Sequence, residues 1–327
     1  MNEKREENFI SMSVKKPTNN RKKKLRPEKT LRHNGGNMLQ IKRLSECTLE
    51  EAVRAWNAGF EGYYFPIQLT LESFLHRLVG EGLSPSLSII AFHHEEPVGI
   101  VLNGVRECKG TSMAWNGGTG VVPAFRKTGI GKALMEATLD IYQQAGVELA
   151  TLEAISENER AIALYKKFGY EIVDELEYLQ FPESVPRLDT KPFQVETTVP
   201  QRVSHLPFYK GGHPWQTQWQ SVKEGEALLV KDEQGGDIGY AYYRRVFDEA
   251  GKHEKTILFQ CEAHPARDDA EPILRFLLTN VFGTCSDEVV KVVVNIPVTH
   301  SSPTYSLLKE IGFQTTVKQV WMQKRMR

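Results

Sequence analysis

The same order of strands and helices is predicted twice along this chain of 327 residues. In residues 38–183, hydrophobic spacing predicts a strand and two helices, and then three strands, a helix, a strand, a helix and a closing strand. Residues 184–327 repeat this order from the group of three strands onward. Two segments of nearly equal length with a shared order indicate a distant internal duplication. The predicted fold class is α/β (α+β), with two domains that each form a mixed, partly splayed β-sheet flanked by helices.

The charge and proline content set the expected domain boundaries. The first 37 residues hold eleven Lys or Arg against four Asp or Glu and few large apolar residues, so residues 1–37 are expected to be a disordered basic extension. This extension is either a nucleic-acid-binding tail or a nonspecific one, and we favour the second, without a specific nucleic-acid partner. Residues 184–214 are rich in proline and polar side chains and are predicted to be a linker between domains at 38–183 and 215–327.

The composition excludes several classes of protein. Hydrophobic residues make up 40% and charged residues 25%, and no run of about 18 apolar residues exists that could span a membrane. The four cysteines, Cys47, Cys108, Cys261 and Cys285, lie far apart without a C-x-x-C pair, which argues against a zinc site and a disulfide scaffold. We therefore expect a cytoplasmic protein without a metal ion or a membrane partner.

The run from Val121 to Gly131 leaves a predicted strand and enters a predicted helix. The first turn of such a helix offers free backbone N–H groups and the positive end of the helix dipole, which together favour an anion. Gly129 and Gly131 let a phosphate approach the backbone, while Arg126 and Lys127 add positive charge. The alternative is that the glycines only permit tight packing. The candidate contacts are Val121, Val122, Arg126, Lys127, Thr128, Gly129, Ile130 and Gly131.

A second motif follows about 25 residues later. Ser156 and Glu159 have the spacing of a capping box, which predicts that Ser156 caps a helix ending near Gly169. Asn158 lies two helical turns before Tyr165 on nearly the same side, so the two side chains can line one channel. The alternative for Tyr165 is a core aromatic residue.

Taken together, the two motifs resemble the GNAT superfamily of acyl-CoA N-acyltransferases. The motifs are Arg-x-x-Gly-x-Gly at residues 126–131 and Asn-x-x-Ala-x-x-Leu-Tyr-x-x-x-Gly-Tyr at residues 158–170. The resemblance covers the first predicted domain. It implies that acetyl-CoA is a co-substrate and that its pyrophosphate binds the backbone of residues 126–131. It further implies that the pantetheine arm lies between splayed strands that end at Val122 and Ala154, and that Asn158 and Ala161 contact the cofactor.

The resemblance also implies the chemical roles. Tyr165 matches the tyrosine that protonates the departing thiolate in many members, and the backbone N–H of Val122 would polarise the acyl carbonyl. Leu152-Glu153-Ala154 is similar to the Leu-Glu-Val of ribosomal-protein alanine acetyltransferases, in which the glutamate is the base. An apolar strand would raise the pKa of Glu153 and suit it to that role. The alternative for Glu153 is a structural pair with Arg or Lys.

The acceptor contacts are less constrained by the sequence. Trp115 and Asn116 precede Gly117-Gly118, a pair of glycines that predicts a bulge in the strand. We expect Trp115 and Asn116 to contact the acceptor, although a strand tryptophan is also common in a core.

The second predicted domain lacks the residues that carry the resemblance. Alignment of Gly312 with Gly169 places Leu308 where Tyr165 stands, and Ser301 where Asn158 stands. Residues 264–272 replace the glycine-rich loop with carboxylates that would repel a pyrophosphate. A degenerate GNAT-like domain without coenzyme A is expected, retained for packing, for a substrate wall or for a homodimer. The aromatic stretch 208–219 either caps an acceptor pocket or is a linker held by Trp215 and Trp219 at helical spacing, and we favour the linker.

The sequence thus predicts an acetyl-CoA-dependent N-acetyltransferase that acts on a small-molecule or peptide amine. The alternative is a noncatalytic acyl-CoA-binding sensor or scaffold. Tyr165 favours the enzyme, because a binding module has no need of a hydroxyl group at that position.

Overall fold

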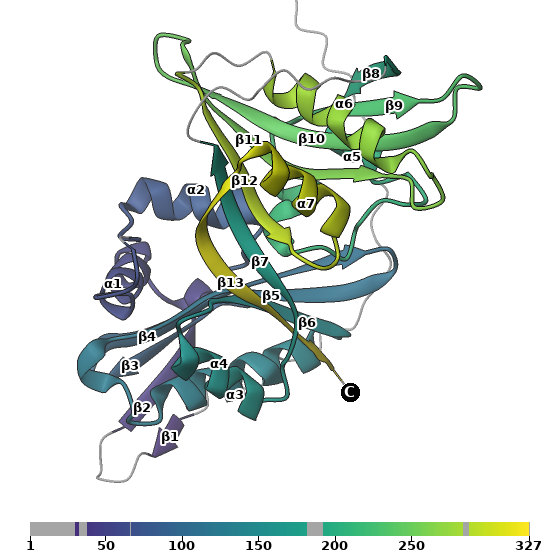
Figure 1. Cartoon of the computed structure of the whole chain (residues 1–327). Coiled ribbons are helices and arrows are strands. Elements are labelled where there is room, and N and C mark those ends of the chain that lie inside the picture. Colours follow the sequence, from purple (N-terminus) through teal and green to yellow (C-terminus); the bar gives the residue numbers. More distant parts are fainter. Residues whose placement is uncertain (1–29, 33–37, 66, 182–191, 284–287, 327) are drawn as a thin grey trace, which may run out of the picture.

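All the strands of the structure join in one continuous sheet (Figure 1). The computed structural model describes residues 30–32, 38–65, 67–181, 192–283 and 288–326. The expectation of disorder at residues 1–29 and 33–37 therefore falls outside the described residues, as does Cys285. The sheet has 13 strands in the order β1-β2-β3-β4-β5-β6-β13-β7-β12-β11-β10-β9-β8.

The first half has the predicted order of elements, with one additional strand at its start. Its elements are β1 (Thr30–Arg32), β2 (Met38–Arg43), α1 (Leu49–Gly59), α2 (Leu71–Glu81), β3 (Ile89–His93), β4 (Glu96–Cys108), β5 (Thr111–Val121), the 3₁₀ turn η2 (Pro123–Phe125), α3 (Ile130–Gln144), β6 (Leu149–Ile155), α4 (Glu159–Lys167) and β7 (Glu171–Phe181). Strand β1 pairs with β2, so residues 30–32 of the expected extension belong to the sheet, contrary to the prediction.

The second half repeats the order. Its elements are β8 (Gln194–Thr198), α5 (Pro200–Val203), the 3₁₀ turns η3 (Trp215–Thr217) and η4 (Trp219–Ser221), β9 (Glu226–Lys231), β10 (Asp237–Phe247), β11 (His253–Ala263), α6 (Ala270–Phe282), β12 (Val290–Pro297), α7 (Ser302–Ile311) and β13 (Gln314–Arg325). Strand β8 and helix α5 lie within the stretch expected to be a linker. They belong to the folded second half instead, because β8 pairs with β9 and forms the edge of the sheet.

The two halves exchange their last strands. Strand β13 lies between β6 and β7 of the first half, and β7 in turn lies between β13 and β12 of the second half. Trp321 of β13 is opposite Glu153 of β6 on one side and opposite Asp174 of β7 on the other. Figure 1 shows β7 and β13 running side by side through the middle of the molecule. Each half therefore completes its sheet with a strand of the other, and the expected boundary between 38–183 and 215–327 is crossed by the sheet.

Both faces of the sheet are covered in each half. Helices α3 and α4 pack on one face of the first half, and α1 and α2 pack on the opposite face. Helices α6 and α7 cover one face of the second half, and the segment from α5 to η4 covers the other. Trp215 is buried in the core under α1 and α2, whereas Trp219 packs on the core of the second half. The expectation that these tryptophans share one helical face is therefore wrong, because two separate 3₁₀ turns carry them.

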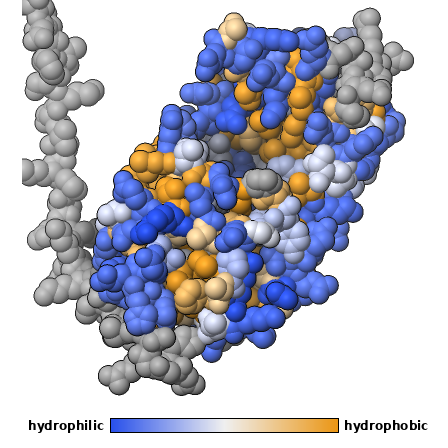
Figure 2. Space-filling view, turned by 90° about the vertical axis from the view of Figure 1, so that its left-hand side faces the viewer, coloured by the Kyte–Doolittle hydropathy of each residue, from blue (hydrophilic) through white to orange (hydrophobic). Residues whose placement is uncertain are grey.

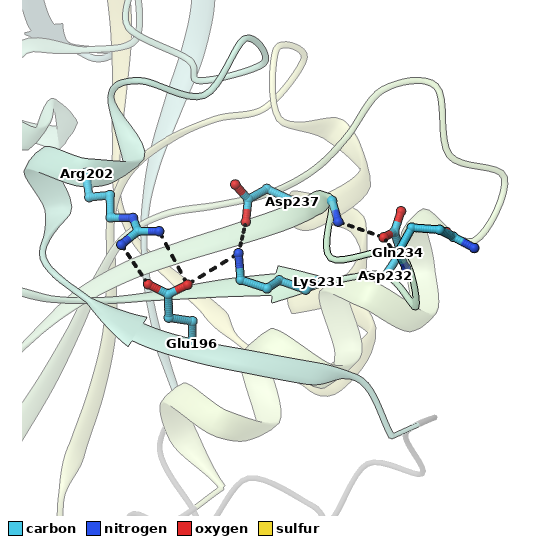
Figure 3. A network of polar contacts seen from close by, with 7 residues as sticks. Glu196, Arg202, Lys231, Asp232, Gln234 and Asp237 are labelled. Carbon is cyan, nitrogen blue, oxygen red and sulfur yellow. Dashed lines mark hydrogen bonds and ion pairs between the residues drawn. The ribbon is translucent and has the colours of Figure 1, made fainter.

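The edge strand β8 is held by a chain of alternating charges (Figure 3). Glu196 of β8 pairs with Arg202 at 2.9 Å and with Lys231 of β9 at 3.3 Å, and Lys231 also pairs with Asp237 of β10 at 2.9 Å. Exposed ion pairs contribute little to stability, at most about 1 kcal/mol each. Their charges nevertheless make this edge a poor template for pairing with another chain. None of the helices in the described ranges is long and apolar enough to cross a bilayer.

The exchange predicts that a cavity made in β13 destabilises the first half as well. Met322 is fully buried in the core of the first half. We expect Met322→Ala to lower the free energy of unfolding by about 2–5 kcal/mol in urea, in one transition for both halves. Gln314→Ala, at the exposed start of the same strand, should change it by less than about 0.5 kcal/mol. A first half that keeps its stability in Met322→Ala would contradict the exchange.

Candidate active site

Strands β5 and β6 separate in the middle of the first half. They pair in parallel from Met113 with Leu149 to Asn116 with Leu152, and no further. Beyond this point β5 stays with β4 as far as Val121, and β6 stays with β13 as far as Ile155. The register of β4 and β5 shifts opposite Gly117, which confirms the predicted bulge. A V-shaped gap therefore opens between the ends of β5 and β6, as the sequence predicts for splayed strands.

An exposed, glycine-containing loop lies at the mouth of this gap. Lys127 and Gly129 both have left-handed backbone angles, with φ of 67° and 98°, and Gly129 precedes the first residue of α3. A glycine at this position has no side chain to cap the helix, so the N-cap supplies no side-chain acceptor to the first-turn N–H groups. The loop combines these donors with the positive end of a helix of 15 residues, which is the arrangement of an anion site.

Two residues of the loop make other contacts than those predicted. The guanidinium group of Arg126 donates to the carbonyl oxygens of Val121, Gly59 and Glu61, so its N–H groups tie the loop to the end of α1. The amide of Val122 donates to the carbonyl oxygen of Val98 at 3.0 Å. The expectation that Val122 polarises the acyl carbonyl through this N–H group is therefore wrong, because the β4 backbone already occupies it.

Helix α4 begins two residues later than predicted. Its N-cap is Asn158, whose Oδ1 accepts a hydrogen bond from the amide of Ala161 at 3.2 Å. The predicted capping box from Ser156 to Glu159 is therefore wrong. The reason is that Asn158, an equally good cap, lies directly before the apolar face of the helix.

Tyr165 lies on the face of the sheet that α3 and α4 cover. Burial raises the pKa of Tyr165, and a hydrogen bond with Thr119 near the end of β5 partly offsets the rise. The hydroxyl of Tyr63, from the segment after α1, interacts with both Asn158 and Tyr165. Three hydroxyl groups thus gather beside the gap, and Tyr165 keeps its proton at neutral pH.

Glu153 lies on the opposite face of the sheet, which α1 and α2 cover. Trp115 Nε1 donates a hydrogen bond to Glu153 Oε2 at 2.6 Å, while Oε1 is buried without a partner among the described residues. Burial raises the pKa of Glu153 to about 7; the bond from Trp115 and the charge of Arg77 lower it, and the charge of Glu81 raises it further. The predicted effect of the apolar strand on Glu153 is thus present, although Arg77 lies near as well.

Trp115 and Asn116 face opposite sides of the sheet, as successive strand residues do. Trp115 is buried against Trp215, with ring centroids 5.5 Å apart. The amide of Asn116 bonds to Thr119 and to the backbone of Gly118, and so it stabilises the bulge. The structure brings Trp115 to Glu153 and does not bring Asn116 there. That both residues contact the acceptor stays a prediction.

A cavity of about 400 Å³ lies on the same face as Glu153, between the two halves. Figure 2 views the molecule from the side of α1 and α2 and shows this hollow, with polar and apolar residues around it. Arg77 and Glu81 of α2 contribute to its wall, as do Tyr178 of β7 and Arg244 of β10. No sequence motif points to these residues or to Tyr63, because they come from segments that lie far apart in the chain.

Comparison with known proteins identifies the first half. Residues 49–170 match the model of the Acetyltransferase (GNAT) family. The first half thus carries a GNAT domain. The matched range contains the bulged strand, the anion loop, Glu153 and Tyr165, and it ends at the second motif.

The GNAT domain also has a curated relative. The chain is 28% identical over 127 residues to the N-alpha-acetyltransferase MAK3 of Arabidopsis thaliana, an alignment that covers 35% of this chain and 66% of that protein. The chain thus spans just under two thirds of the length of this relative.

Solved structures extend the similarity to both halves. A GCN5-related N-acetyltransferase from Sphaerobacter thermophilus superposes with a TM-score of 0.57 at 15% identity, over 88% of this chain and 96% of the other. A tandem GNAT protein from the clavulanic acid biosynthesis pathway gives a TM-score of 0.55 at 13% identity, over 88% and 98%. At such low identity these similarities establish the fold alone.

The GNAT-like second half has the same splay, but side chains fill it. Strands β11 and β12 pair only from Lys255 with Val290 to Leu258 with Val293. Beyond this point Ser301 Oγ donates to Glu262 Oε1 at 2.5 Å, and the cavity that remains is only about 10 Å³. That volume holds about one water molecule and cannot hold a pantetheine arm.

The alignment of the two motifs agrees with the helix ends. The amide of Tyr170 donates to the carbonyl of Tyr165, and the amide of Phe313 donates to that of Leu308, each across a left-handed glycine. These are matching Schellman bonds, which support the alignment of Leu308 with Tyr165. Within the described ranges, no group of three or more His, Cys, Asp or Glu is placed to hold a metal ion.

The raised pKa of Glu153 predicts a dependence of stability on pH. The folded protein binds a proton at Glu153 more tightly than the unfolded chain does, and this tighter binding stabilises the fold. The stabilisation is fully present below about pH 4.5 and is lost as the pH rises through 7. We compare the unfolding free energies of Glu153→Gln and the wild type in urea. From pH 5 to pH 8, we expect their difference to shift in favour of Glu153→Gln by about 2–4 kcal/mol.

The exposed Glu171→Gln is the matched control, because its carboxylate stays in water in both states. A constant difference between Glu153→Gln and the wild type across this range would contradict the assigned environment of Glu153.

Proposed function

We propose that the first half is an acetyl-CoA-dependent N-acetyltransferase that transfers an acetyl group to an amine by direct attack on the thioester. The observation that carries this proposal is the position of Tyr165 and Glu153 on opposite faces of the sheet at the gap between β5 and β6. A hydroxyl group that keeps its proton thus lies on one face, and a carboxylate with a pKa of about 7 lies on the other. The GNAT domain of the first half supports acyl transfer at this gap.

The cofactor-binding residues follow from this arrangement. The pyrophosphate would bind the backbone N–H groups of residues 126–131, and the pantetheine arm would pass between the open ends of β5 and β6. Val121 and Val122 would line one side of the gap, and Asn158 and Ala161 the other. The filled gap of the second half supports a single site in the chain.

The reaction needs a neutral amine and a proton for the leaving sulfur. Glu153 would take a proton from the ammonium group of the acceptor, whose nitrogen then forms the new bond to the acyl carbon. The carbon–sulfur bond breaks, and Tyr165 gives its proton to the thiolate. The nitrogen then loses its second proton to solvent, Tyr165 regains a proton from solvent, and the net release is one proton per acetyl group transferred. The two faces of the sheet keep the entry of the amine apart from the exit of the thiol.

The anion loop is tested by a graded series at Gly131. A Cβ atom there would lie 3.5 Å from Leu164 and 3.9 Å from Val121, so Gly131→Ala has room in the folded protein. We expect calorimetric affinity for acetyl-CoA to fall about 10-fold in Gly131→Ala and at least about 100-fold in Gly131→Glu, because the carboxylate repels the pyrophosphate. The midpoint of thermal unfolding of the alanine variant should stay unchanged. Undiminished affinity in the glutamate variant would overturn the loop assignment.

The role of Tyr165 is tested against that of its neighbour Tyr170. The two rings lie 6.1 Å apart and both are buried, but the Tyr170 hydroxyl has no partner among the described residues. We expect Tyr165→Phe to lower kcat about 10- to 1,000-fold in a thiol-release assay without changing acetyl-CoA affinity, while Tyr170→Phe leaves kcat unchanged. Tight acetyl-CoA binding by the wild type without turnover on any amine would instead favour a noncatalytic acyl-CoA sensor or scaffold.

A further inference from the structure

The cavity between the two halves has an unusual balance of charge for an amine site. Arg77, Lys223 and Arg244 contribute to its lining, against the single carboxylate of Glu81. Burial lowers the pKa of Arg77, which reflects the cost of keeping this guanidinium group away from water. A cavity of about 400 Å³ is large enough for a small organic molecule. Its charge does not suit an acceptor that carries only positive groups.

Buried polar atoms of both signs lie without partners in this region of the described structure. The Nε atoms of Arg77 and Arg244 are buried without an acceptor, and Glu81 Oε2 and Glu153 Oε1 are buried without a donor. Unpartnered buried groups are costly in a folded protein, and a ligand that pairs with them removes the cost. Arg77, Glu81 and Arg244 line the cavity, and Glu153 is not among its lining residues.

The charged groups define an inner and an outer end of the cavity. Arg77 Nη2 donates to the carbonyl of Gly117 at 2.7 Å, which ties the inner part of the cavity to the bulge of β5, and the charges of Arg77 and Glu153 interact. Arg244 belongs to β10 of the second half, and the exposed Lys223 donates to the carbonyl of Val79 at the end of α2. The inner end thus lies toward Glu153, and the second half adds cations beyond it.

We propose that the acceptor is a small amine that also carries an anionic group, a carboxylate or a phosphate. Its amine points inward, toward Glu81 and Glu153, and its anion pairs with Arg244 of the second half at the outer end. The inference rests on the proposed acetyl transfer and adds the class of substrate. The second half of the chain thereby selects the acceptor, since it supplies Arg244, Lys223 and Gln216 to the wall.

The test compares matched amines that differ only in the anion. The pairs are L-lysine and cadaverine, L-phenylalanine and phenethylamine, and O-phosphoethanolamine and ethanolamine, together with a tetrapeptide amide. Binding is measured by calorimetry on the full chain, with and without saturating coenzyme A, so that no transfer occurs. We expect the anionic member of at least one pair to bind about 10-fold or more tightly than its partner. The third pair distinguishes phosphate from carboxylate.

The variant Arg244→Gln should reduce this preference to within about threefold. Arg245→Gln is the matched control, because Arg245 follows on the same strand and pairs with Glu226 at 3.4 Å. Equal or tighter binding of the plain amines or of the peptide amide would overturn the inference, as would no binding of any anionic amine. Failure of coenzyme A to bind, with the anion preference intact, would overturn the proposed acetyl transfer and leave the inferred anion site standing.

Discussion

The pairing of β13 with β6 and β7 is the constraint on which the rest of the structure depends. Strand β6 carries Glu153, and its pairing with β5 ends at Leu152. Beyond that point, β13 is the only one of the described strands that holds the last residues of β6 in the sheet. The gap between β5 and β6 can therefore stay open without loss of the sheet, because the C-terminal strand supports its outer wall. An active site in the first half thus requires backbone from the second.

The same exchange gives the second half a role after the loss of its own site. Its gap is filled by the bond between Ser301 and Glu262, and Leu308 stands where a tyrosine would be needed. It still places the segment that follows α5 against the first half. There, Trp215 stacks on Trp115, and the guanidinium of Arg106 lies 3.4 Å from the centre of the Trp215 ring. The tryptophan that orients Glu153 is thereby held by a residue about 100 positions further along the chain.

Much of the site could be predicted from the sequence, because its signals are local. The anion loop, the bulge at Gly117 and the spacing from Asn158 to Tyr165 depend on neighbouring residues and on helical geometry. Predictions failed where a second nearby residue could play the same part, or where the bonding partner lies far away in the sequence. Asn158 caps α4 in place of Ser156, and the amide of Val122 is occupied by β4.

The strand exchange and the cavity between the two halves had no local signal at all. A closing strand has the same pattern of apolar residues whether it pairs within its own half or in the other. The cavity is lined by residues of α2, β7, β10 and β11. Arg77 and Arg244 line one space only when these elements pack together. Contacts of this kind depend on tertiary packing, which single-sequence periodicity does not encode.

The position of β13 in the chain has a consequence for synthesis. At roughly 5–20 residues per second, a ribosome needs about 10–35 s to advance from Ile155 at the end of β6 to Arg325 at the end of β13. During that interval, the outer edge of β6 has no neighbour and can pair with any extended strand that it meets. Strand β13, which covers this edge of β6, is thus the last of the described strands to leave the ribosome, and a nascent chain must keep this edge unpaired until then.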